Sequence, residues 1–228
     1  MPASAVDWFP LWLSLRVACL ATLLVLTIGT FVAYVLSHKS FRGKNLLDSL
    51  ITLPLVLPPT VLGYYLLVVI GRTSPVGHFY EALFGHPLVF TWQAAVIAAF
   101  IHSAPIYIKA ARAVLETVDY RYEWAAHGLG ASEWRTFWRV TLPLARRGLG
   151  ALATLSFARS LGDFGVTIMV AGNIPGRTQT LAVAIYDAVE SGNGALARIL
   201  VLVVSAAALA LLWPASYWSR SPRANFSA

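Results

Sequence analysis

The sequence predicts an all-α polytopic membrane protein with about five transmembrane helices. Of its 228 residues, 58% are apolar and only 12% are charged, whereas roughly 25% of the residues of soluble domains are charged. Apolar runs of about twenty residues recur along the chain, and this is the length that a membrane-spanning helix needs. The helices of a soluble bundle would also need charged outer faces, and these are missing.

The expected spans are separated by segments that differ in charge. They cover about 11–36, 46–70, 89–108, 148–170 and 195–213. Most of the 17 Lys and Arg lie in the 37–45 loop, between 109 and 147, and near the C-terminus. Positive segments stay on the cytoplasmic side. We therefore expect one transmembrane domain over residues 1–228, with the N-terminus outside and the C-terminus inside.

Composition also narrows the function classes. The net charge of +7 comes mainly from segments between spans, so it indicates topology rather than nucleic-acid binding. Cys19 is the only cysteine, which excludes a disulfide or a cysteine metal cluster within one chain. An intramembrane enzyme would need converging ionisable groups in the spans. Only Arg159, Asp163 and His102 are available, so no catalytic residue, metal or cofactor is expected.

The second expected span contains Pro54, Pro58 and Pro59. Proline breaks the backbone ladder, and a membrane tolerates this only where protein or a water-filled cavity satisfies the freed groups. Two interpretations remain open. The prolines either form a kink packed between helices or line a polar route through the membrane.

The polar segment, residues 119–143, is the longest polar interval of the chain. Gly128 and Gly130 predict a tight turn between two short helices, and Ser132 is a suitable N-cap for a helix Glu133–Val140. Its aromatic residues Trp134, Phe137 and Trp138 share one face, and Leu142–Pro143 is expected to end the helix. The segment is either a partner-binding surface or a helix lying on the bilayer.

The polar segment resembles the signature loop of ABC-importer permeases, which reads Glu-Ala-Ala, three further residues, Gly, and a closing hydrophobic-x-Leu-Pro. The matching residues are Ala125, Ala126, Gly130, Val140, Leu142 and Pro143. Trp124 stands at the glutamate position, and the acid is Glu123, one residue earlier. One residue turns a helix by about 100°, so whether Glu123 takes the glutamate role is open.

The resemblance implies that the polar segment is a coupling helix that docks on a cytoplasmic ATPase. The implied docking residues are Glu123, Trp124, Ala125, Ala126, Gly130, Trp134, Phe137, Leu142 and Pro143. The chain has no Gly-rich phosphate loop with its Lys and Ser/Thr, so a separate subunit would bind ATP. The chain itself is then a transport subunit and not an enzyme.

Residues 156–186 are similar to molybdate-transporter permeases, in which Ala-Arg-Ser-Leu-Gly, an acid and Phe-Gly precede Asn-Ile-Pro-Gly and threonines. The runs 53–67 and 40–44 also resemble that family. Sulfate permeases share the Arg-Ser-Leu-Gly-acid part. The later part, with Thr178 and Thr180, favours molybdate, from which tungstate is inseparable.

The resemblance therefore implies the permease subunit of a molybdate ABC importer in the bacterial cytoplasmic membrane. Such a permease works by alternating access as a homodimer, with two ATPase subunits and an external molybdate-binding protein. A permease for tungstate or sulfate is the alternative, and an intramembrane enzyme or a non-transporting scaffold is the alternative of another class.

The candidates for the pathway or its gate are Pro58, Pro59, Arg159, Asp163, Thr167 and Asn173. At i, i+4 on one helix, Arg159 and Asp163 can pair, which lowers the cost of two charges in the membrane. This pair either holds a gate or leaves Arg159 to contact the oxyanion. Residues 178–190 include an apolar run too short to cross, and whether they enter the membrane is open.

Overall fold

The computed structural model describes residues 7–218, and every regular element in this range is helical. The prediction of an all-α chain is thereby confirmed. The first helical run is 30 residues long, from Phe9 to His38. It consists of α1 (Phe9–Leu24), a π-helical turn η1 (Val25–Gly29) and α2 (Thr30–His38).

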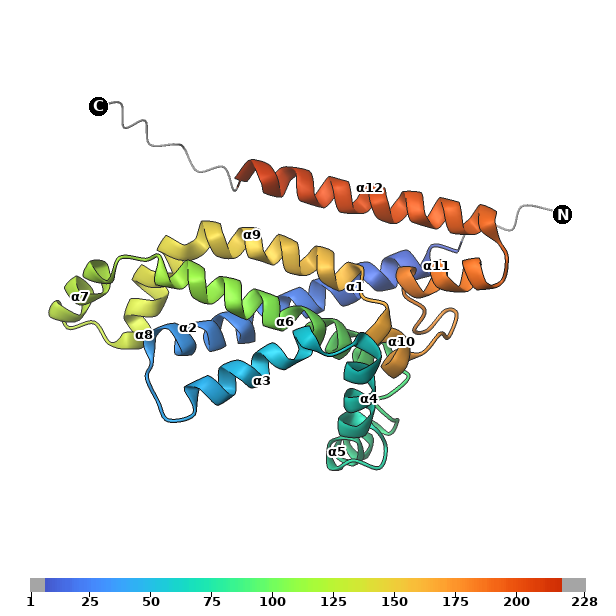
Figure 1. Ribbon diagram of the computed structural model, residues 1–228, viewed down its shortest axis with the longest axis horizontal. Coiled ribbons are helices and arrows are strands. Elements are labelled where there is room, and N and C mark those ends of the chain that lie inside the picture. Colours follow the sequence, from blue (N-terminus) through green and yellow to red (C-terminus); the bar gives the residue numbers. More distant parts are fainter. Residues whose placement is uncertain (1–6, 219–228) are drawn as a thin grey trace.

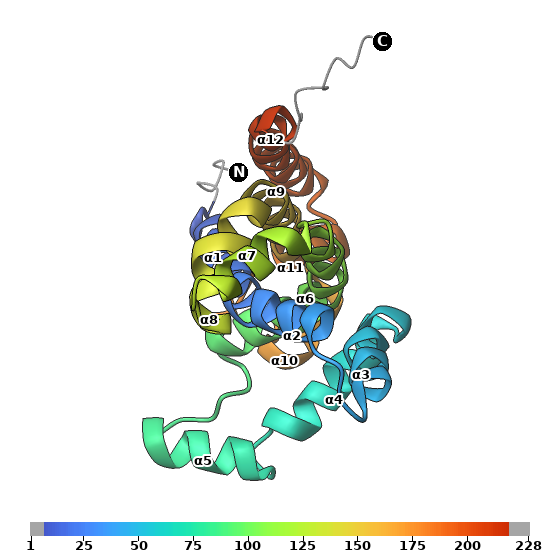
Figure 2. The same cartoon turned by 90° about the vertical axis from the view of Figure 1, so that its left-hand side faces the viewer.

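The next two helices are α3 (Lys44–Val56) and α4 (Pro59–Ile70), and the chain bends by 119° between them. Leu57 is extended, as expected for a residue before proline, and Pro58 is the N-cap of α4. The break predicted from the prolines is therefore present. After α4, the helix α5 (Pro75–Phe84) projects away from the bundle (Figure 2).

The helix α6 (Trp92–Glu116) is the centre of the bundle, where it packs against α1, α2, α3, α9 and α10. Its buried face is rich in alanine, and small side chains let neighbouring backbones approach closely. These buried alanines are Ala94, Ala95, Ala98, Ala99, Ala104 and Ala111. Larger side chains complete the core around Tyr107, whose hydroxyl lies 2.6 Å from the Thr30 hydroxyl.

The polar segment folds into α7 (Tyr120–Gly128), α8 (Glu133–Thr136) and a second π-helical turn η2 (Phe137–Thr141), followed by α9 (Leu142–Leu161). The expectation that Leu142–Pro143 ends a helix is wrong, because Leu142 is helical with φ −63° and ψ −44°. The wider π turn immediately before Pro143 accommodates the missing N–H. The polar segment is consequently continuous with α9.

The last elements are α10 (Gly165–Ala171), α11 (Leu181–Glu190) and α12 (Gly194–Trp218). In Figure 1 the polar segment and the end of α2 lie at one end of the molecule, while α11 and the start of α1 lie at the other. α12 covers the outside of the bundle and packs against α9 and α11.

Among the described residues, two helical stretches are long and apolar enough to cross a membrane, namely Phe9–His38 and Trp92–Glu116. The bent pair α3–α4 makes a third if it counts as one span. The helix expected over 148–170 is interrupted between the end of α9 at Leu161 and the start of α10 at Gly165. The five-span topology and its orientation stay predictions.

Candidate functional site

The turn of the polar segment is built as the sequence predicts at Gly130. This glycine is left-handed with φ +84°. Its N–H donates to the His127 carbonyl, and the Ala131 N–H donates to the Ala126 carbonyl. These two hydrogen bonds form the Schellman motif at the C-terminal end of α7. Gly128, by contrast, is the last residue of α7, so only one of the two glycines supplies the unusual geometry.

The start of α8 is also as predicted, since the Ser132 hydroxyl accepts a hydrogen bond from the Arg135 N–H at 3.4 Å. The rings of Trp134, Phe137 and Trp138 form one cluster, with centroids 5.5 to 5.9 Å apart. Phe137 is only 5% exposed and packs on Tyr34 of α2 at 4.5 Å. The predicted aromatic face is therefore divided, with one ring anchored inside and two rings at the surface.

The outer side of the polar segment is apolar and aromatic. Leu129 is 90% exposed and Trp124 is 68% exposed. The other exposed residues of this kind are Tyr120, Tyr122, Trp134 and Trp138. Ala125 and Pro143 are exposed as well, whereas Ala126 and Leu142 are half-buried. A cluster of large apolar side chains at a protein surface indicates a binding site.

Glu123 faces the opposite way from Trp124, and its side chain is only 13% exposed. One carboxylate oxygen, Oε1, accepts a hydrogen bond from the Thr141 hydroxyl at 2.5 Å and lies 3.1 Å from His38 Nε2. The His38 ring in turn lies 2.6 Å from the Ser37 hydroxyl. The carboxylate of Glu123 is thus occupied inside the chain, and Trp124 occupies the outer surface.

Further contacts join the polar segment to the end of α2. Lys39 Nζ donates to both carboxylate oxygens of Glu133 at 2.6 Å. This ammonium group lowers the pKa of Glu133 below its ordinary value. The Tyr34 ring stacks on the His38 ring at 4.4 Å. The polar segment and the end of α2 are more than eighty residues apart in the sequence, and these contacts hold them together.

A second feature lies where the α3–α4 break meets the interruption between α9 and α10. A Cβ on Gly165 would lie 2.6 Å from the Pro59 Cβ, and a Cβ on Gly63 would lie 2.6 Å from the Met169 Cβ. Only glycine allows α4 and α10 to approach so closely. Pro58 and Pro59 are nevertheless exposed.

Asp163 and Thr167 lie together at this break. Asp163 is 5% exposed and accepts a hydrogen bond from the Thr167 hydroxyl at 2.6 Å. Arg159 instead donates through Nε to the His102 carbonyl at 3.4 Å. In the part of the chain that the structure describes, Arg159 and Asp163 form no ion pair. The predicted pairing is wrong because α9 ends at Leu161, so the two residues are not on one helix.

Asn173 belongs to a different cluster. Its amide donates to Asp187 Oδ1 at 2.9 Å, and its Oδ1 accepts from Gln179 Nε2 at 2.8 Å. The Thr178 hydroxyl is buried and accepts from the Ile174 N–H at 3.2 Å. These bonds hold the 172–180 loop against α11. Sequence reasoning missed Gln179 and Asp187, because no local pattern connects the Asn173 amide to an acid fourteen residues away.

Comparison with known proteins identifies relatives over nearly the whole chain. Residues 25–218 match the sequence profile described as "Binding-protein-dependent transport system inner membrane component". The molybdenum transport system permease protein ModB of Escherichia coli K12 is 44% identical over 208 residues, which is 90% of this chain and 91% of that protein. ModB of Haemophilus influenzae is 45% identical and covers 78% of both chains. The protein cysT of Chlorokybus atmophyticus, assigned to a sulfate transport system, is 34% identical over 88% of this chain and 70% of its own length.

Two solved structures have the same fold. The methionine ABC transporter MetNI, in inward-facing conformations, matches 92% of this chain and 93% of its own with a TM-score of 0.69 at 17% identity. A chain of the bacterial alginate ABC transporter, in complex with its pentasaccharide-bound periplasmic protein, matches 96% and 80% with a TM-score of 0.73 at 15% identity.

Proposed function

Because this chain belongs to the family of binding-protein-dependent transport system inner membrane components, we propose that it is the permease subunit of an ATP-driven molybdate importer. The observation that carries the proposal is the 44% identity to a molybdenum permease along 90% of the chain. The weaker identity to the sulfate relative, 34%, makes sulfate the second candidate oxyanion. Tungstate has the same charge and shape as molybdate, so it would use the same route.

The exposed side of the polar segment is where we place the ATPase. Trp124, Leu129, Trp134 and Trp138 are exposed on the polar segment, which lies at one end of the molecule, and large aromatic residues are typical anchors of protein interfaces. The Gly130 turn holds this surface in shape. Glu123 would not contact the ATPase, since its carboxylate is bonded to Thr141 and His38.

Movement of the ATPase would reach the membrane through two connections. The first is a set of contacts with the C-terminal part of α2 and the residue after it. Glu123 contacts His38, Glu133 pairs with Lys39, and the Phe137 ring packs on Tyr34. The second is the uninterrupted backbone from α8 through η2 into α9. Closure of the ATPase on ATP would therefore move the long N-terminal helix and α9 together. This coupling supports alternating access, in which ATP shifts the population towards an outward-open state.

For the pathway, we favour the contact between α4 and α10. Backbone interruptions in a membrane are tolerated where they line a cavity or are buried in protein. Asp163 and Thr167 are buried beside the break and serve to hold it, while the half-buried Arg159 supplies the positive charge that an oxyanion would meet. Asn173 stabilises the outer loop. A homodimer would place two such breaks around one route, with two ATPase subunits inside and one binding protein outside.

The test is ATP-dependent uptake of molybdate into liposomes that contain the permease, its ATPase subunit and its binding protein. We expect tungstate to compete with molybdate as an equal and sulfate to compete more weakly. Trp124→Ala should reduce both ATPase co-purification and uptake. The matched control is Trp8→Ala, another exposed tryptophan, which directly precedes α1 at the opposite end of the molecule. Uptake that sulfate blocks better than tungstate would assign the permease to sulfate, and no ATP-dependent uptake of any of these oxyanions would refute the proposal.

A further inference from the structure

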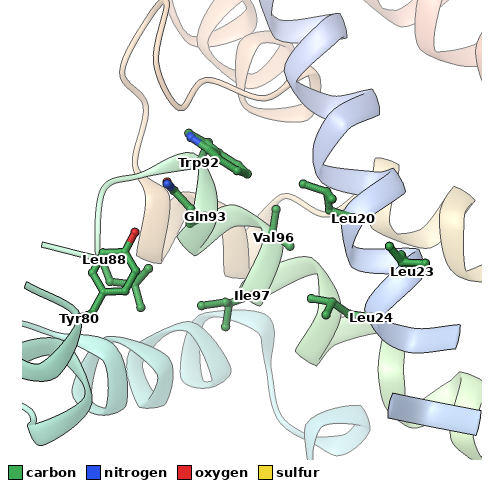
Figure 3. A pocket seen from close by; sticks show the side chains of 9 residues that line it. All are labelled: Leu20, Leu23, Leu24, Tyr80, Leu88, Trp92, Gln93, Val96 and Ile97. Carbon is green, nitrogen blue, oxygen red and sulfur yellow. The ribbon is translucent and has the colours of Figure 1, made fainter. Parts of the chain in front are cut away.

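An open hollow of about 320 Å³ lies between α1, α5 and the first turns of α6. Its volume is in the range of sites that hold small ligands. Figure 3 shows the side chains that line it, which are almost entirely apolar. They include Leu20, Leu23 and Leu24 from α1 and Trp92, Val96 and Ile97 from α6.

A positive charge lies beside Trp92, one of the side chains that line this hollow. Arg16 lies one helical turn before Leu20, on the same stripe of α1 as Leu20 and Leu23, and therefore about 6 Å along the axis. Its guanidinium group lies 3.8 Å from the centroid of the Trp92 ring and 5.3 Å from that of Trp12. Among the described residues Arg16 forms no ion pair. Within the described residues its guanidinium group therefore contacts aromatic rings and no carboxylate.

Gln93 follows Trp92 at the beginning of α6 and also lines the hollow, but its Oε1 is buried and offers no surface to an occupant. Deeper in the hollow, at Leu24 and Ile97, only apolar contact is available.

We propose that this hollow binds an anionic phospholipid of the phosphatidylglycerol class. An acyl chain would lie along the leucines, and the phosphate would pair with Arg16. A free phosphate ion would leave the apolar part empty. A second copy of this chain carries a net charge of +7 and offers Arg16 no excess of negative charge. The chemistry of the hollow therefore fits an anionic amphiphile best.

The test is native mass spectrometry of the complete transporter after exchange into phosphatidylglycerol or phosphatidylcholine, with retained lipid counted. Wild type should retain phosphatidylglycerol preferentially. Arg16→Gln should reduce this preference about fivefold, which is the effect of one arginine at an anionic lipid surface. Leu23→Trp, at a lining position that is itself exposed, should fill the hollow and abolish retention. The matched controls, Arg198→Gln and Leu202→Trp at exposed positions of α12, should behave as wild type.

Three results would overturn the proposal. The first is an unchanged lipid preference in Arg16→Gln or unchanged retention in Leu23→Trp. The second is displacement of the lipid by inorganic phosphate at constant ionic strength, which would assign the site to a small anion. The third is dissociation of a permease dimer by Leu23→Trp with lipid retention unchanged, which would assign the hollow to a second copy. All readouts are independent of transport activity.

Discussion

Replacing Gly130 by alanine is expected to weaken docking of the ATPase through backbone strain alone. Gly130 has φ +84°, and a Cβ added there would meet nothing within 4 Å. No steric clash therefore contributes. The left-handed conformation costs an L-residue about 1–2 kcal/mol. If the turn must keep its shape for docking, the dissociation constant of the ATPase should rise about 5- to 30-fold.

The matched control is Gly128→Ala. Gly128 also has open space around its Cβ position, but it lies in α7 with ordinary backbone angles. Alanine there should leave docking unchanged and stabilise α7 by about 0.5–1 kcal/mol. Two further substitutions of Gly130 should change the loss of ATPase affinity by different amounts. Gly130→Asn should be milder than alanine, because asparagine tolerates the left-handed region, and Gly130→Val should be more severe.

The measurement is the affinity of the purified ATPase subunit for the permease reconstituted in nanodiscs. The order of affinities should be glycine, asparagine, alanine and valine at position 130. Equal affinities for Gly130→Val and wild type would refute the reasoning, as would equal losses in Gly128→Ala and Gly130→Ala. In either case the left-handed turn would not shape the docking surface.

Three other predictions concern the buried Glu123, the Lys39–Glu133 ion pair and the contact between α4 and α10. Glu123→Ala should lower molybdate uptake per ATP hydrolysed while ATPase affinity changes little, because its carboxylate bonds within the chain; a large loss of affinity in a binding assay would contradict this. The Lys39–Glu133 pair should stabilise the fold at neutral pH and lose this contribution as pH falls through the lowered pKa of Glu133, so thermal unfolding of Glu133→Gln and wild type should differ at pH 7 and converge in acid. Gly165→Ala should disturb the α4–α10 contact by about 1–3 kcal/mol and reduce uptake without affecting ATPase binding, whereas Gly150→Ala, with nothing within 4 Å of its added Cβ, should be neutral in both assays.

The features of the polar segment that could be predicted are those encoded within a few residues. The Ser132 cap and the Gly130 turn were predictable because a side-chain acceptor and the absence of a Cβ act locally. The break at Pro58–Pro59 was predictable for the same reason. The end of the helix at Pro143 was wrongly predicted, because a π turn with Phe137 and Thr141 buried precedes Pro143 and the helix continues through it.

Contacts across the bundle could not be predicted from spacing. The i, i+4 pairing of Arg159 and Asp163 assumed a continuous helix, but the chain leaves the helix after Leu161. Asp163 then bonds to Thr167 and Arg159 to a carbonyl of α6. Gly162 and Gly165 flank the interruption, but the partners that Asp163 and Arg159 find there depend on neighbouring helices.

By itself, the sequence determined the all-α fold class and singled out the polar segment with its exposed aromatic residues. Hydrophobic content, capping residues and proline act over a few neighbouring residues, so they can be read directly from the chain. Only the tertiary structure decided that Glu123 turns inward while Trp124 turns outward. The reason is that the partners of Glu123 are Thr141 and His38, the latter 85 residues earlier, and burial of a carboxylate depends on the groups that the fold brings to it.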